Sequence, residues 1–140
     1  MTKPISGYVA QAFGRPTRMQ ADHLALLATD GPMCVSTMAF ELGGKSTAKA
    51  AMMIRLNQSG WVHRAGLGVQ GEPYIWTVTD EGRRALLRQR HHALVRAQDE
   101  ATKARRPRQQ RQTAARLVVA RRELKAAEAA QPKETADAAP

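Results

Sequence analysis

Apolar residues recur at helical spacing in the first half of the chain. In residues 19–28, one helical stripe is formed by Met19, Leu24, Leu27 and Ala28, which predicts a helix. Asp30-Gly31-Pro32 follows and ends this helix, since glycine releases a helix and proline cannot continue one. A second, shorter helix is predicted over residues 35–42, ahead of the pair Gly43-Gly44. Before these helices, residues 1–18 contain several glycines and prolines and predict an irregular arm.

A third helix is predicted over residues 47–59, where Ser46 is placed to serve as the N-cap and Gly60 follows the last turn. Five of its residues share one face, which we expect to pack into the core. That face consists of Ala48, Ala51, Met52, Arg55 and Leu56, with Arg55 at its edge. The residues then predicted to face outward are Lys45, Ser46, Thr47, Lys49, Ala50 and Met53.

The periodicity changes after the third helix. Residues 61–64 and 74–78 are rich in aromatic and β-branched side chains, which is typical of strands. The glycine-rich segment 65–73 between them predicts the connection of a β-hairpin. Thr79 then caps a further helix. Pro107 divides the rest into helical pieces over about residues 82–105 and 109–130, since a proline inside a helix costs about 3 kcal/mol.

Two short segments carry a resemblance to a known family. Residues 55–62, RLNQSGWV, resemble the end of a recognition helix entering the wing of a winged helix-turn-helix domain. Residues 78–86, VTDEGRRAL, resemble the stretch that leaves the wing in MarR-like and PadR-like bacterial transcriptional regulators. The resemblance covers about residues 19–90. It implies a DNA-binding fold in which the third helix enters the major groove and the hairpin serves as the wing.

Helical spacing and resemblance together predict a fold that is mainly α with a β-hairpin, an α+β class. The winged helix-turn-helix domain is expected over residues 19–82. A long basic helical extension, broken near Pro107, follows over residues 83–131, and residues 132–140 are expected to be a disordered tail.

Charge is distributed very unevenly along the 140 residues. The chain carries 22 Lys and Arg against 12 Asp and Glu, and residues 83–125 account for 14 of the basic and only 3 of the acidic side chains. A block of one sign favours a polyanionic partner, with nucleic acid ahead of an anionic membrane surface. The four arginines of its densest part are expected to clamp the DNA backbone electrostatically. They are Arg105, Arg106, Arg108 and Arg111.

The same basic stretch has a second interpretation. Leu87 and Leu94, and then Leu117 and Leu124, fall on sparse heptad seams. These seams indicate weak homodimerisation, with the arginines facing water. The charge run alone does not distinguish DNA from RNA, because it contacts neither base nor sugar selectively.

Double-stranded DNA is the expected partner of the predicted domain. Lys45 and Lys49 would contact phosphates, and Ser46 and Thr47 a phosphate or a base. Ala50 or Met53 would touch a thymine methyl group. On the predicted hairpin, Arg64 is a candidate for a phosphate contact and Gln70 lies in the loop expected to approach the DNA.

Enzymatic classes are disfavoured by what the sequence lacks. Residues 39–47, AFELGGKST, satisfy a relaxed P-loop pattern, but a P-loop follows a strand of a parallel sheet that this short chain cannot build. Cys34 is the only cysteine, and neither it nor His91-His92 has partners at metal-ligand spacing. We expect no enzyme activity, no cofactor and no metal. No membrane span or signal peptide is apparent, so a bacterial cytoplasmic, nucleoid-associated location is expected.

Two functions follow from the sequence. The first is a transcriptional regulator that occupies an operator as a homodimer, without a chemical step. The second is an adaptor, whose winged domain binds a protein of the replication, partition or transcription machinery while the basic stretch holds nucleic acid loosely.

Overall fold

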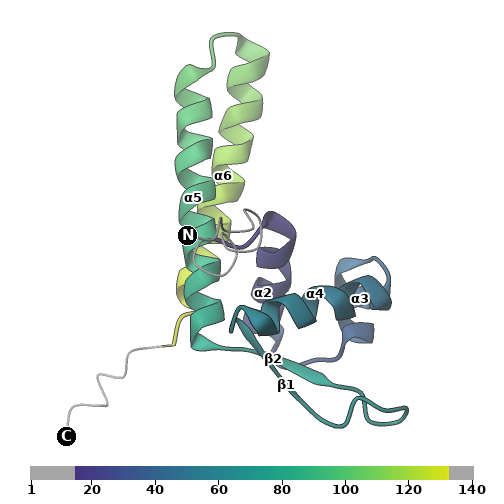
Figure 1. The fold of residues 1–140 in the computed structure, drawn as a ribbon. Coiled ribbons are helices and arrows are strands. Elements are labelled where there is room, and N and C mark those ends of the chain that lie inside the picture. The colour runs from purple at the N-terminus through teal and green to yellow at the C-terminus, as the bar shows by residue number, and fades with distance from the viewer. Residues whose placement is uncertain (1–14, 133–140) are drawn as a thin grey trace, which may run out of the picture.

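The computed structural model describes residues 15–132 and shows a mainly helical chain with one two-stranded antiparallel sheet (Figure 1). This confirms the α+β class. Most of the predicted irregular arm and the predicted disordered tail lie outside the described residues. The elements are α2 (Arg18–Asp30), α3 (Val35–Leu42), α4 (Ser46–Gln58), β1 (Val62–Ala65), β2 (Ile75–Val78), α5 (Asp80–Lys103) and α6 (Pro107–Ala129).

Helix α2 begins one residue before the predicted start because Thr17 caps it. The Thr17 hydroxyl accepts from the Gln20 amide, and the Gln20 side chain accepts from the Thr17 amide, which completes a capping box. The apolar face of α2 then packs against α5, β2 and α3. The largest fully buried side chains of this core are Leu24, Leu27, Met38, Met53, Leu56, Trp61, Val62 and Leu86.

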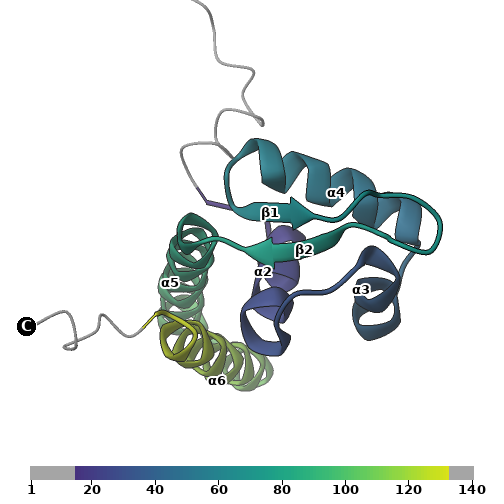
Figure 2. The same ribbon diagram turned by 90° about the horizontal axis from the view of Figure 1, so that it is seen from below.

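The two strands pair in a simple hairpin register. Val62 lies opposite Val78 and Ala65 opposite Ile75. The segment between α2 and α3 extends this sheet through a single bridge, because the backbone amide and carbonyl of Met33 both bond to those of Trp76. Figure 2 shows the hairpin lying between α4 and α2, with its loop projecting past the helices. The sheet therefore fixes α4 relative to the rest of the core.

The basic stretch forms a folded helical hairpin. Helices α5 and α6 run antiparallel, and Figure 1 shows the upper part of the pair standing away from the other elements, while the lower part of α5 packs against α2. The break predicted near Pro107 lies between α5 and α6. Pro107 itself is the first residue of α6, where its missing amide has no helical partner to lose. Small side chains such as Ala97 and Ala120 are buried in this hairpin. At the base of the hairpin, near the end of α6, Ala127 belongs to the same core as Leu24 and Trp61.

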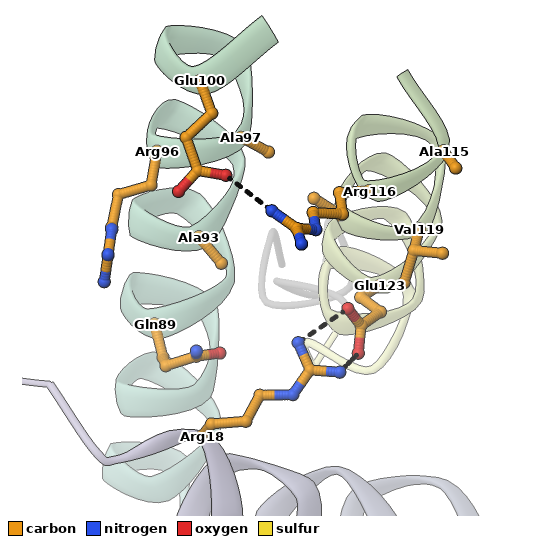
Figure 3. Close-up of a pocket in the computed structure, with 11 residues that line it drawn as sticks. Arg18, Gln89, Ala93, Arg96, Ala97, Glu100, Ala115, Arg116, Val119 and Glu123 are labelled. Carbon is orange, nitrogen blue, oxygen red and sulfur yellow. Dashed lines mark hydrogen bonds and ion pairs between the residues drawn. The ribbon is translucent and has the colours of Figure 1, made fainter. Parts of the chain in front are cut away.

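Ion pairs attach the base of this hairpin to α2. Arg18 donates to both carboxylate oxygens of Glu123, at 3.1 and 2.7 Å (Figure 3). Arg90, whose side chain is only 5% exposed, lies 3.1 Å from Asp22 and 3.6 Å from Glu123. Gln131 adds a bond to the Arg83 carbonyl at 2.9 Å. Residues from both ends of the chain therefore hold α5 and α6 against α2.

Within the described residues, none of the helices combines the length and the apolar character needed to cross a bilayer.

Candidate nucleic-acid interface

Helix α4 is rotated relative to the sequence prediction. Lys49 is only 7% exposed and Met53 is fully buried, whereas Ala48 is exposed. The buried stripe is therefore Lys49, Met53 and Leu56, spaced four and three residues apart. The expectation that Lys49 and Met53 face outward is wrong, because Met53 provides a large apolar anchor that Ala48 could not. Ser46 is likewise the first helical residue, and Lys45 occupies the N-cap position.

The buried position of Lys49 depends on His23 of α2. The Lys49 ammonium lies 2.7 Å from His23 Nε2, and His23 Nδ1 lies 2.7 Å from the Met19 carbonyl oxygen. A carbonyl can only accept, so Nδ1 carries the proton and Nε2 accepts from Lys49. Burial lowers the pKa of His23 below its ordinary value of 6.5, and the nearby Lys49 charge lowers it further. The imidazole is thus neutral, and the pair carries one positive charge.

The opposite face of α4 is open to solvent. It presents hydroxyl, amide, guanidinium and methyl groups, a set able to contact base edges and phosphates. Of the residues proposed from sequence, Lys45, Ser46 and Thr47 are exposed there and Ala50 is half-buried. The exposed residues that the sequence prediction missed on α4 are Ala48, Ala51, Ile54, Arg55 and Gln58. The charge of Arg55 was the available signal, since a guanidinium at a core position needs a partner that the sequence did not provide.

The segment predicted as the wing, residues 65–73, corresponds to the hairpin loop of residues 66–74. Arg64 stacks on the Tyr74 ring, with its guanidinium carbon 4.5 Å from the ring centroid. At the turn of the loop, Val69 and Glu72 form two backbone hydrogen bonds with each other. Gln70 lies between them and is exposed. Gly68 has φ +70, and a Cβ there would lie 2.4 Å from the Tyr74 ring, so this close approach requires glycine. Arg64 is thereby held on the edge of the loop.

The P-loop-like segment has a different geometry from a nucleotide-binding loop. The element before Gly43-Gly44 is helix α3, where a P-loop requires a strand. Gly43 caps α3 with φ +77, and three residues separate α3 from α4. The two glycines therefore serve a tight turn between helices.

The second group of predicted contact residues lies far from α4. Arg105, Arg106, Arg108 and Arg111 are all exposed around the loop that joins α5 to α6. Figure 1 shows this loop at the opposite end of the molecule from the β1–β2 loop. The structure brings these four arginines together with one another but not with Lys45, Thr47 or Arg64.

Two grooves flank these surfaces. One, of about 530 Å³, runs between α5 and α6 over an alanine-rich floor (Figure 3). Four of its charged residues are paired, as Arg18 with Glu123 and Arg116 with Glu100, and Arg96 also lines it. The other, of about 640 Å³, lies between α2 and the turn before α4, next to His23 and Lys49. In the described part of the chain, no cluster of three or more side chains suits a metal ion.

Comparison of the chain with protein families, with curated proteins and with solved structures gives no match. Any function must therefore be argued from the site itself.

Proposed function

We propose that this protein is a winged helix-turn-helix transcriptional regulator that places α4 in the major groove of duplex DNA. The observation that carries the proposal is the exposed face of α4, where Thr47, Arg55 and Gln58 stand clear of the core on one helix. Helices α3 and α4 meet at a short glycine-containing turn, an arrangement typical of helix-turn-helix pairs. The antiparallel hairpin follows directly, in the position of a wing.

The side chains on this face have suitable chemistry for base recognition. An arginine can donate two bonds to guanine, and a glutamine can bond bidentately to adenine. Arg55 and Gln58 supply these groups one helical turn apart. Thr47 and the methyl of Ala51 suit a phosphate or a thymine methyl group near the start of the helix.

The loop and the turn would supply the backbone contacts. Arg64 is held over Tyr74, so it loses less conformational entropy on binding a phosphate than a free arginine would. Lys45 is exposed at the N-terminus of α4, where the helix dipole also favours an anion. In this proposal the protein acts by occupying its site and uses no cofactor.

A homodimer is part of the proposal. Helix α5 carries Leu94, which is partly exposed, and Val95, which is largely exposed, whereas Leu87 already packs against the core. The other seam has a different use, because Leu124 and Ala127 of α6 are buried within the chain itself. A dimer would therefore form through α5.

An adaptor that binds a protein is the second candidate. It is favoured by exposed apolar side chains around the same surface: Phe40 on α3 is 86% exposed, and Leu67 and Val69 on the hairpin loop are also exposed. Large exposed apolar groups are more typical of protein interfaces than of phosphate contacts.

Site selection from a random duplex library tests the DNA-binding proposal. We expect the full chain to enrich a defined motif, and we expect T47A/R55A to lose most of the preference for that motif over random DNA, since each base contact contributes about 1–3 kcal/mol. T102A/R121A is the matched control, because it removes the same two side-chain types from exposed positions on α5 and α6. Duplex binding without any enrichment would contradict base recognition by α4.

A further inference from the structure

The loop between α5 and α6 presents a concentrated positive surface, which we call the tip (residues 103–111). It contains five basic and no acidic residues. Lys103 is paired with Asp99 at 2.9 Å. The four arginines of the tip are exposed, and none of their guanidinium groups forms an ion pair or hydrogen bond with a described residue. The tip therefore carries charge that nothing in the described chain neutralises.

Nearby carboxylates are already engaged. Asp99 pairs with Lys103, and Glu100 lies 3.7 Å from Arg116. The first turn of α6 has no acidic residue, and the side chain of its N-cap, Arg106, forms no capping bond. The uncapped amides of that turn add to the positive potential that the arginines create. The surface is thus suited to a polyanion.

The tip is also far from α4. Helix α5 has 24 residues and so spans about 36 Å. Figure 1 shows the tip and the β1–β2 loop at opposite ends of the molecule. The hairpin between them is anchored, because Ala127 lies in the core and Glu123 is bound by Arg18 and Arg90. The two surfaces are held apart by packing and ion pairs rather than joined by a flexible tail.

We propose that the tip binds a second segment of duplex DNA, so that one molecule bridges two duplexes or two distant sites on one. This inference rests on the proposed function for its first DNA contact. The tip arginines would bind backbone phosphates, which are the same in DNA of any sequence. The sequence-specific surface would then select a location, and the tip would hold a second segment there.

A capture experiment tests bridging with the full chain. A biotinylated 25-base-pair duplex carrying the selected motif, or a random sequence, is fixed on streptavidin beads, and a fluorescent duplex of unrelated sequence is added with the protein. We expect the wild type to retain the fluorescent duplex. If the four tip arginines each neutralise a phosphate, raising salt from 50 to 200 mM weakens that capture by roughly 100-fold.

Two variants with equal loss of charge separate the tip from general electrostatics. R105A/R106A/R108A/R111A is expected to bind the bead duplex and to lose the fluorescent one. R96A/R121A/R122A/K125A removes four exposed cations from α5 and α6 outside the tip and is expected to retain capture.

Several results would overturn bridging. Capture that persists in the tip variant would assign it to other surfaces, for example to α4 of a second subunit. The tip variant could bind a single 40-base-pair duplex more weakly than the wild type does, while the wild type fails to capture the fluorescent duplex. That result would place the tip on the same DNA as α4. Preferential capture of an RNA duplex would replace DNA as the partner. If capture depends on the tip but no motif is enriched, bridging stands and the proposed sequence-specific function fails.

Discussion

Lys49 carries a positive charge into the core, and its neighbours explain how the fold tolerates it. Its ammonium donates to His23 Nε2, while its aliphatic stem occupies the place of an apolar anchor. His23 is fixed in turn by the Met19 carbonyl. The buried charge is therefore linked to one histidine that must stay neutral, because a protonated His23 could no longer accept from Lys49.

Acidification is expected to destabilise the fold through His23. Burial is the main cause of its lowered pKa, Lys49 adds to it, and the Met19 carbonyl and Asp22 oppose it. The unfolded chain thus binds this proton at higher pH than the folded chain, so the free energy of unfolding falls as pH drops below about 6.5. Urea denaturation of the wild type and of H23Q between pH 7.5 and 5 measures this, and the variant should show a shallower decline.

H63Q is the control for loss of one histidine, because His63 is exposed on β1. The free energy of unfolding of H63Q should fall on acidification as that of the wild type does. An equal slope in wild type and H23Q would contradict a neutral, buried His23.

Helices α5 and α6 show how elements that look unstable in sequence are stabilised by tertiary contacts. Their exposed faces are highly charged. Of their ten buried residues, two are the leucines Leu86 and Leu124, and four are alanines. Such small side chains bury little apolar area. The ion pairs at the base of the hairpin, between Arg90, Arg18 and Glu123, therefore matter more here than ion pairs at an exposed surface would.

Neutralising Glu123 is expected to destabilise the chain more than neutralising Glu100. E123Q leaves the buried Arg90 with Asp22 as its remaining acidic partner and weakens the link to Arg18, a loss of about 1–2 kcal/mol. E100Q breaks a pair whose side chains are both more than 40% exposed, so it should change stability by less than about 0.5 kcal/mol. Guanidinium denaturation of both variants measures the difference, and equal midpoints would contradict anchoring by Glu123.

The boundaries of the helices were largely predictable from local signals, whereas the orientation of α4 was not. Gly43 and Pro107 mark ends through backbone geometry, and Thr79 marks the start of α5 through its side-chain cap on the Gly82 amide. The buried face of α4 depends on His23, which lies in another helix and accepts from Lys49. A buried helix face that includes a lysine is not apparent from hydrophobic spacing. The sequence therefore favoured the neighbouring face, which includes Ala48 and Met52.

At the scale of the whole molecule, the main difference from the sequence prediction concerns the basic stretch. Its composition predicted an extension, and the two helical pieces were expected. The sequence did not predict that α6 returns to the core through Ala127 and Gln131. Each of these residues contacts residues more than forty positions away in the chain. The consequence is an anchored hairpin that separates the arginine-rich tip from α4.

This arrangement gives the two surfaces different roles in the proposal. The α4 face combines few charges with varied polar groups, which suits sequence discrimination. The tip combines many charges with no such variety, which suits salt-dependent backbone binding. A duplex bound only through the tip would account for affinity but not for selectivity.

Amide mapping by NMR tests whether α4 binds duplex DNA. A ¹⁵N-labelled full chain is titrated with a 16-base-pair duplex carrying the selected motif, and backbone shifts are followed. If α4 enters the major groove, the largest chemical-shift changes are expected in residues 45–58 and 64–72. Within α4, the change should be smaller at the buried Met53 than at Arg55. Changes confined to residues 103–111, or none in α4, would contradict recognition of DNA by this helix.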